Sequence, residues 1–411
     1  MAEKCVLAYS GGLDTSVAVK WLMDNYGVEV VTLTVDVGGE IDLQAVKERA
    51  LATGAVDARI LEVKDQFVRY FVFPALQAGA VYEGKYPLAT ALARPLMAYH
   101  LVEVAREVGA GSVAHGCTGK GNDQVRFDVG VRTLEPGLRI IAPAREWGMD
   151  RDQEIEYARK HNIPVPLTKA SPYSIDENLW GRSIETGVLE DPAKEPPEDA
   201  YQWTLSPEKA PDKPQYLNID FEGGIPTALD HKEMDGVSLI QELNRVVGTH
   251  GVGRIDHVEN RLVGIKSREV YEAPAAVVLL AAHRALEDMT LSKEQARFKD
   301  RVAQEYADLI YNGLWFTAHH QDLHSYVQST QRHVTGTVRV KLYKGSCQVV
   351  GRDSPKSLYS LKEATYGKDD AFDQRAAPGF IDIFSKSARL QAEVQLLDQP
   401  EGPLGITGPS E

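Results

Sequence analysis

The sequence predicts an α/β protein that begins with a doubly wound, mostly parallel five-stranded sheet and continues as an α+β region with a helical tail. Two observations predict this class. Up to about residue 142, short apolar runs alternate with segments in which apolar residues recur at helical spacing. After Pro164 and Pro166 this alternation ends, and a segment with six prolines, residues 189–215, leads into mixed elements.

Five apolar runs are the expected strands, at residues 5–9, 29–35, 58–63, 112–115 and 139–142. Helical periodicity fills the intervals, with helices expected from the turn at 10–12 to Tyr26, at 43–50 and at 94–108. Ligands of an open parallel sheet lie beyond the carboxyl ends of its strands. The turns that follow the strands are therefore the expected site.

The elements after the proline-rich segment are expected to be both strands and helices. A strand is expected at 216–221, helices at 237–247 and 275–289, a hairpin at 337–352 turning near Lys344 and Gly345, and a helical tail at 381–397. Tyr201 and Trp203 lie within the proline-rich segment. They favour an arm packed on a surface, because a solvated linker has little use for aromatic side chains.

Composition excludes several classes of protein. The 411 residues carry a formal charge of −14, so the bulk electrostatics attract neither nucleic acid nor an anionic membrane. The longest strongly apolar stretch, 273–282, is about half of the roughly 20 residues that cross a bilayer, and no signal-peptide pattern is present. Three widely spaced cysteines without a CxxC pair indicate neither disulfides nor a zinc site. We expect a cytoplasmic protein.

The loop after the first strand, residues 10–16, has the sequence Ser-Gly-Gly-Leu-Asp-Thr-Ser. Backbone amides at the start of a helix favour an anion, two glycines allow a phosphate to approach closely, and Ser10, Thr15 and Ser16 add hydroxyl donors. The loop matches neither the Walker pattern nor GxGxxG. Its alternative interpretation is a glycine-rich turn capped by Ser or Asp.

A second loop, residues 115–126, follows the fourth expected strand and is rich in glycine and polar residues. Its backbone amides can hold an α-carboxylate, Asp123 can receive an α-ammonium group, and Arg126 can bind a second carboxylate. The loop therefore predicts amino-acid recognition. The alternative is a turn that leads into a capped helix with solvated charges. Cys117 lacks an activating base and is interpreted as a small packed residue.

Residues 8–16 resemble the loop of the PP-loop ATP pyrophosphatases, and within that superfamily they resemble the argininosuccinate synthases. Four later segments are similar to motifs of the same family in the same order: 78–84, 114–127, 258–261 and 266–272. The resemblance covers most of the chain, from residue 4 to about residue 385.

The resemblance implies a Rossmann-like fold and a carbon–nitrogen ligase of arginine biosynthesis. ATP, with Mg²⁺, would be split to AMP and pyrophosphate, and citrulline and aspartate would be joined through citrullyl-AMP to argininosuccinate. The implied parts are a nucleotide-binding domain at 1–168, an α+β synthetase domain for citrulline binding and multimerisation at 169–375, and an oligomerisation tail at 376–411. A homotetramer held partly by this tail is also implied.

Individual roles follow from the same resemblance. The residues that would line the ATP pocket are Ala8, Tyr9, Ser10, Gly11, Gly12, Leu13, Asp14, Thr15, Ser16, Val35 and Gly116. The residues that would bind aspartate are Thr118, Asn122 and Asp123. The residues that would bind citrulline are Tyr86, Asn122, Arg126, Ser174, Ser183, Glu259 and Tyr271. Ser10, Asp14 and Asp123 would be catalytic, and no residue is assigned to a metal.

One departure from the family concerns Ala89, Thr90 and Ala91, which stand where the family usually has Gly-Thr-Ser. The serine hydroxyl expected near the citrulline carboxylate is absent, so Ala91 is not assigned to the site. Taken from the residues alone, Glu259 could equally pair with the neighbouring cations Arg261 or Lys266.

Two other functions share the first loop. A tRNA-thiolating or tRNA-lysylating PP-loop enzyme is disfavoured by the acidic charge and by the missing cysteine pair. A non-catalytic nucleotide-binding module would account for the first 165 residues and would leave the polar 115–126 loop and the second half of the chain without a purpose.

Overall fold

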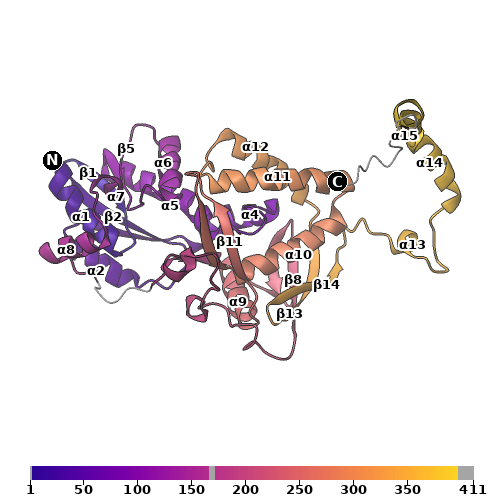
Figure 1. Ribbon diagram of the computed structural model, residues 1–411, viewed down its shortest axis with the longest axis horizontal. Helices are drawn as coiled ribbons and strands as arrows, with labels where there is room; N and C mark the ends of the chain where they lie inside the picture. Colours follow the sequence, from indigo (N-terminus) through magenta and orange to yellow (C-terminus); the bar gives the residue numbers. More distant parts are fainter. Residues whose placement is uncertain (1, 166–171, 397–411) are drawn as a thin grey trace, which may run out of the picture. The chain divides into compact units, whose positions relative to one another are not determined.

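The computed structural model describes residues 2–165 and 172–396 of the chain. The chain forms two compact units, residues 1–358 and residues 359–411 (Figure 1). The predicted boundary between 168 and 169 lies outside the described residues, and the predicted division into three parts stays a prediction.

The first unit begins with a five-stranded parallel sheet in the order β3-β2-β1-β4-β5. Its strands are β1 Lys4–Ala8, β2 Glu29–Asp36, β3 Asp57–Glu62, β4 Ser112–Ala114 and β5 Arg139–Ile141. The predicted strands and the predicted fold class are confirmed, although β1, β3, β4 and β5 each end one residue before the expected position and β2 ends one residue after it. Chain order reverses between β1 and β4, and this switch point is where open α/β sheets bind ligands.

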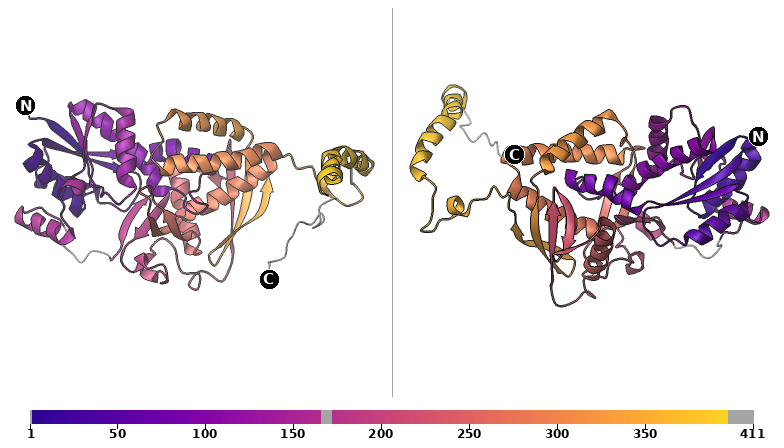
Figure 2. Two further views of the ribbon diagram at one scale, coloured as in Figure 1. Left: turned by 45° about the horizontal axis from the view of Figure 1, so that its top comes forward. Right: turned by 180° about the vertical axis from the view of Figure 1, so that it is seen from behind.

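Helices cover both faces of this sheet (Figure 2). They are α1 Leu13–Tyr26, α2 Leu43–Thr53, α5 Ala89–Val108, α6 Asp123–Leu134, α7 Pro143–Glu146 and α8 Arg151–Lys160. Side chains alternate across a strand, so Cys5 and Leu7 of β1 pack with Leu22 of α1, while Val6 packs on the other face with Leu101 of α5. Burial on both faces explains why β1 is a continuous apolar run.

Helix α5 begins at Ala89, five residues before the predicted start at Arg94. Residues 89–93 are all buried, so this first turn lacks the polar face that gives an amphipathic helix its periodic pattern. The prediction from periodicity was therefore correct for the exposed part of the helix and wrong at its buried beginning.

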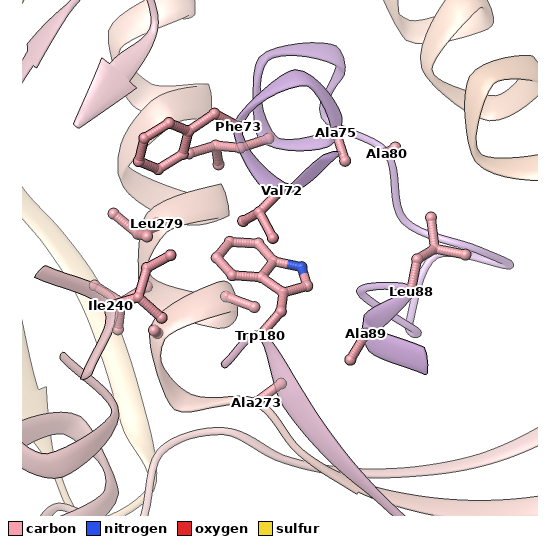
Figure 3. Close-up of a cluster of buried hydrophobic side chains, with 14 of the residues drawn as sticks. Val72, Phe73, Ala75, Ala80, Leu88, Ala89, Trp180, Ile240, Ala273 and Leu279 are labelled. Atoms are coloured by element: carbon pink, nitrogen blue, oxygen red, sulfur yellow. The ribbon is translucent and has the colours of Figure 1, made fainter. Parts of the chain in front are cut away.

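The segment between β3 and α5 packs with elements that come much later in the sequence. It forms α3 Lys64–Phe67, a π-helical turn at Val68–Val72 and α4 Phe73–Ala78. Val72 and Phe73 share one hydrophobic core with Trp180, Ile240 and Leu279 (Figure 3). The first 165 residues are thus joined to the later ones by a common core.

The later elements of the first unit build two antiparallel sheets. One has four strands in the order β11-β12-β7-β6, with β6 Ser174–Asn178, β7 Gly181–Glu185, β11 Arg254–Asn260 and β12 Lys266–Glu272. The other has the order β10-β9-β8-β13-β14, with β8 Gln215–Glu222, β9 Ile225–Leu229, β10 Lys232–Glu233, β13 Gly336–Tyr343 and β14 Ser346–Asp353. The predicted strand at 216–221 and the predicted hairpin at 337–352 are confirmed.

Four long helices accompany these sheets: α9 Gly236–Thr249, α10 Pro274–Thr290, α11 Lys293–Tyr311 and α12 Ala318–Gln331. The first two confirm the helices predicted at 237–247 and 275–289. The other two were missed, although α11 begins with a capping box formed by Ser292 and Gln295, which is a readable start signal.

The proline-rich segment packs against the rest of the first unit, as its aromatic residues predict. It contains two short 3₁₀ helices, Gly187–Glu190 and Glu198–Ala200. The fully buried carboxylate of Glu272 accepts hydrogen bonds from the backbone amides of Gln202, Trp203 and Thr204 at 2.8–2.9 Å, and from Arg182 Nη1 at 3.0 Å. A buried charge is tolerated only when it is paired and hydrogen-bonded, so this carboxylate fixes the path of the segment.

The second unit consists of short helical pieces: α13 Leu361–Ala364, a 3₁₀ turn at Gln374–Ala376, α14 Ala377–Phe384, α15 Lys386–Gln391 and a π-helical turn at Ala392–Leu396. The helical tail predicted at 381–397 is confirmed up to residue 396, with a one-residue break at Ser385 between α14 and α15, and residue 397 lies outside the described residues. In the described ranges, no helix is long and apolar enough to cross a membrane.

Replacing Glu272 by Gln should lower the free energy of unfolding by about 3 kcal/mol, because it removes the carboxylate that pairs with the buried guanidinium of Arg182 at 3.0 Å and leaves only Glu177, at 3.4 Å, to balance that charge. Urea denaturation of the purified chain measures this change. Glu242→Gln is the control, since its partner Arg245 lies on the surface and the expected change is under about 0.5 kcal/mol. Equal losses in the two variants would contradict the role of the buried pair.

Candidate active site

A cavity of about 530 Å³ lies at the carboxyl edge of the parallel sheet, at the switch point between β1 and β4. The predicted ATP residues that line it come from the turns after β1, β2 and β4: Ala8, Tyr9, Ser10, Gly12, Leu13, Asp14, Thr15, Val35 and Gly116. Ser174, predicted to bind citrulline, lines the cavity from β6. A second cavity of about 540 Å³, around Trp315 and His320, has a separate set of lining residues.

The first loop is held open by its own hydrogen bonds. Gly12 caps the amino end of α1 in an extended conformation, and its amide donates to Ser10 Oγ at 3.3 Å. The hydroxyl groups of Ser10 and Thr15 are 3.1 Å apart. Ser16 lies fully buried behind the loop, with its Oγ 2.9 Å from the Tyr9 hydroxyl. The free amides at the start of α1 therefore face the cavity, where they can bind an anion.

Glycine is required at two positions of this wall. Gly11 has φ +78°, its carbonyl accepts a hydrogen bond from the Arg49 guanidinium, and a Cβ there would lie 2.8 Å from Val46 Cγ2. At Gly116 a Cβ would lie 2.9 Å from Thr15 Cγ2, so the two loops touch at this point. The glycines serve both backbone conformation and close packing.

Asp14 in the first turn of α1 faces Glu154 of α8, a residue that the sequence reasoning missed. Burial, followed by the neighbouring Asp14 carboxylate, raises the pKa of Glu154 to about 8, so Glu154 is mostly protonated at neutral pH. Within residues 2–165 and 172–396, no group of three His, Cys, Asp or Glu side chains is arranged to hold a metal ion. Asp14 is an oxygen donor of the kind that Mg²⁺ accepts together with phosphate oxygens.

The second loop is organised around Asp123, at the start of α6. One carboxylate oxygen accepts from Arg126 Nη1 at 2.8 Å, and the other accepts from Arg94 Nη2 at 2.8 Å. Arg94 also forms an ion pair with Asp176 of β6. Burial opposes the charge of Asp123, but the two guanidinium groups outweigh it and lower the pKa of this carboxyl. Thr118, which precedes this cluster in the same loop, is exposed.

The remaining predicted citrulline residues meet around Glu259 on β11. This carboxylate is 3% exposed, and its two oxygens accept hydrogen bonds from the hydroxyls of Tyr271 and Tyr311, each at 2.5 Å. The rings of Tyr86 and Tyr271 are stacked with their centroids 4.3 Å apart. Of the two alternatives left open for Glu259, neither applies, because Arg261 pairs instead with acidic residues of β7 and β12, and Lys266 Nζ donates to Asn260 Oδ1 at 2.6 Å.

The start of α5 lies beside these residues. Tyr86 Oη accepts hydrogen bonds from the backbone amides of Thr90 at 2.9 Å and Ala91 at 3.4 Å, and the Thr90 hydroxyl is 3.0 Å from Ser183 Oγ. Arg126 Nη2 is buried and has no hydrogen-bond partner among the residues that the structure describes. A buried donor without a partner is costly, so this guanidinium is poised for an anionic group.

Cys117 lines the cavity, and burial followed by the negative charge of Asp123 raises the pKa of its thiol to about 12. The thiol therefore stays protonated at neutral pH, which agrees with its interpretation as a packed residue rather than a nucleophile.

Three residues that organise the site were missed by the sequence reasoning: Arg94, Asp176 and Tyr311. Each belongs to a helix or strand distant in sequence from its partners, and single charged or aromatic residues at such positions carry no local signal. Arg94 was seen only as the expected start of a helix.

The parallel sheet, the loop at its switch point and the antiparallel sheets define a protein with a PP-loop-type N-terminal domain and a C-terminal α+β domain. Comparison with family models agrees. Residues 4–164 match the model described as "Arginosuccinate synthase N-terminal HUP domain", and residues 173–391 match "Arginosuccinate synthase C-terminal domain". The chain belongs to the argininosuccinate synthase family.

Curated relatives named argininosuccinate synthase are similar over nearly the whole chain. The protein from Dehalococcoides mccartyi is 58% identical, covering 98% of this chain and 99% of its own. Those from Symbiobacterium thermophilum and Oceanobacillus iheyensis are 56% and 55% identical, covering 96% and 98% of this chain and 98% and 96% of their own. A solved U34-tRNA thiolase from Methanococcus maripaludis is 16% identical, with a TM-score of 0.26. The match covers 42% of this chain and 60% of the thiolase chain.

Replacing Gly11 by Ala should weaken ATP binding by roughly tenfold, about 1.4 kcal/mol, because the added methyl group collides with Val46 and displaces the loop. Isothermal titration calorimetry measures the Kd. Gly27→Ala is the matched control: Gly27 also has a positive φ, +64°, but none of the described atoms lies within 4 Å of its Cβ position. A Gly11 variant that binds ATP as tightly as the Gly27 variant would contradict the role of the loop.

Proposed function

We propose that this chain joins citrulline and aspartate into argininosuccinate and splits ATP into AMP and pyrophosphate. The observation that carries this proposal is the 55–58% identity to proteins of that name over 96–98% of the chain. The arrangement of the site supports it, because Arg94 lines the same cavity as the loop at 10–16 and forms an ion pair with Asp123, the residue proposed to bind aspartate.

In the proposed reaction the ureido oxygen of citrulline attacks the α-phosphorus of ATP and expels pyrophosphate. The aspartate amine then attacks the ureido carbon of the citrullyl-AMP and displaces AMP. No side chain acts as a nucleophile, so the chain contributes orientation and stabilisation of phosphate charge. The amides of residues 10–16 and the hydroxyls of Ser10 and Thr15 are suited to that task.

Mg²⁺ fits this site, where the bound ion would neutralise part of the triphosphate charge. Asp14 is the residue proposed to hold it, directly or through water, with the phosphate oxygens of ATP. The place of Asp14 in the first turn of α1, on the wall of the cavity beside Ser10 and Thr15, supports this role.

The acceptor groups are divided between two clusters. Glu259 is proposed to accept hydrogen bonds from the ureido N–H groups of citrulline, and Arg126 to bind its carboxylate through the buried Nη2. Asp123 is proposed to bind the ammonium group of aspartate, together with Thr118 and Asn122. Because both oxygens of Asp123 already accept from arginines, the ammonium group would use their remaining lone pairs.

The reaction itself tests the proposal. Release of AMP and pyrophosphate from Mg-ATP should require citrulline, and argininosuccinate, identified by mass, should form only when aspartate is also present. Thr118→Val, which leaves the ion pairs of Asp123 in place, should raise the KM for aspartate by at least about tenfold, the loss expected for one hydrogen bond to a charged group, with the KM for ATP unchanged. If AMP is released at the same rate with and without the two amino acids, the acceptor assignment is refuted and only nucleotide binding remains.

A homotetramer is part of the proposal and is supported by the second unit. Its helix α14 exposes Phe380, Ile383 and Phe384 to 65%, 72% and 77%. Exposed apolar side chains of this size in one short helix are typical of a surface that another chain covers. The cytoplasmic location stays a prediction of the sequence.

Replacing Ile383 and Phe384 together by Asp should lower the molar mass in solution, because two carboxylates cannot be buried in an interface between copies. Light scattering coupled to gel filtration measures the mass. Ser387→Asp adds a charge to an exposed polar position nearby and should leave the mass unchanged. If the double variant keeps the mass of the unmodified chain, the tail does not hold the assembly.

A further inference from the structure

Tyr311, the last residue of α11, contacts both polar groups at the centre of the proposed citrulline pocket. Its hydroxyl donates to Glu259 Oε1 at 2.5 Å and accepts from Asn122 Nδ2 at 2.8 Å. Burial and the adjacent Glu259 carboxylate raise the pKa of Tyr311, so its hydroxyl keeps the proton that it donates. One neutral hydroxyl therefore links a carboxylate on β11 with an amide at the start of α6.

The rest of Tyr311 is fixed by independent contacts. Arg126 Nε donates to its backbone carbonyl at 2.8 Å, and the Arg126 guanidinium lies 4.8 Å from the centre of its ring. The ring of Tyr82 is stacked on the ring of Tyr311, with the two centroids 3.6 Å apart. The hydroxyl is thus delivered to one position by a ring that has little freedom to move.

The hydrogen-bond directions show what this position accomplishes. Asn122 Nδ2 donates a hydrogen bond to the Tyr311 hydroxyl. Asn122 Oδ1 therefore faces the backbone amide of Leu262 and accepts from it at 2.9 Å. Each oxygen of Glu259 receives one phenolic hydroxyl, which leaves further lone pairs on that carboxylate for a ligand with two N–H groups. A ureido head presents two such groups, whereas a guanidinium or an ammonium head would also bring a positive charge.

We infer that Tyr311 is a positioning residue of the acceptor pocket, which holds Glu259 and Asn122 in the arrangement that binds the ureido head of citrulline. This inference rests on the proposed function. It extends the pocket to α11, and none of the sequence motifs includes that helix.

Tyr311→Phe tests the inference in the full-length chain, since it removes the hydroxyl and keeps the ring, the stack on Tyr82 and the backbone bond to Arg126. The KM for citrulline should rise by at least about tenfold, the value of one hydrogen bond to a charged group, while the KM and the Kd for ATP stay within about twofold. Tyr306→Phe is the matched control on the same helix: its buried hydroxyl lies 3.2 Å from His324 Nδ1, and its removal should leave the KM for citrulline unchanged.

The outcomes separate this inference from the proposed function. If the unmodified chain makes no argininosuccinate, the proposed function fails and the inference falls with it. If the unmodified chain is active and Tyr311→Phe keeps its KM for citrulline, the inference alone is overturned. A variant that loses affinity for ATP and citrulline alike, with a lower Tm, would assign Tyr311 a purely structural role and would also overturn it.

Discussion

The carboxylate of Asp123 lies between the buried guanidinium of Arg126 and the largely buried guanidinium of Arg94, and the geometry of the whole site depends on this arrangement. Arg94 comes from α5 and Arg126 from α6, and neither charge is tolerable in the interior without its counter-charge. Arg94 also binds Asp176 on β6, and Arg126 binds the carbonyl of Tyr311 at the end of α11. A single charge network thus connects the parallel sheet, the four-stranded antiparallel sheet and a helix far along the chain.

Much of the fold could be predicted from the sequence because the parallel sheet is buried on both faces. Its central strands β1, β2 and β4 are short and mostly buried, and the helices between the strands carry periodic apolar positions, so the two patterns are easily separated. Prediction failed for a strand whose charged side chains face the cavity. Strand β6 contains Asp176 and Glu177, whose side chains line the cavity, so its sequence lacks the alternation of an ordinary edge strand.

The part of the site that consists of consecutive residues could be predicted from the sequence, whereas the part that is assembled from distant elements could be predicted less completely. Seven consecutive residues form the phosphate loop, and their sequence alone indicates an anion site at the start of a helix. The acceptor pocket draws on α5, α6, β6, β7, β11, β12 and α11. Resemblance supplied several of its residues, but Glu154 and Tyr311 acquire their surroundings only when distant elements meet. Which substrate each side chain binds stays a prediction.

The core shared by Val72, Phe73 and Trp180 has a consequence for synthesis on the ribosome. Val68 and Phe73 also lie against Gly236, where a Cβ would be 2.7 Å from either side chain. During translation these apolar residues emerge well before the segments around residues 236–286 that cover them. The nascent N-terminal part therefore presents an uncovered apolar surface until more than half of the chain has been made, and exposed apolar surface of this kind favours aggregation during synthesis.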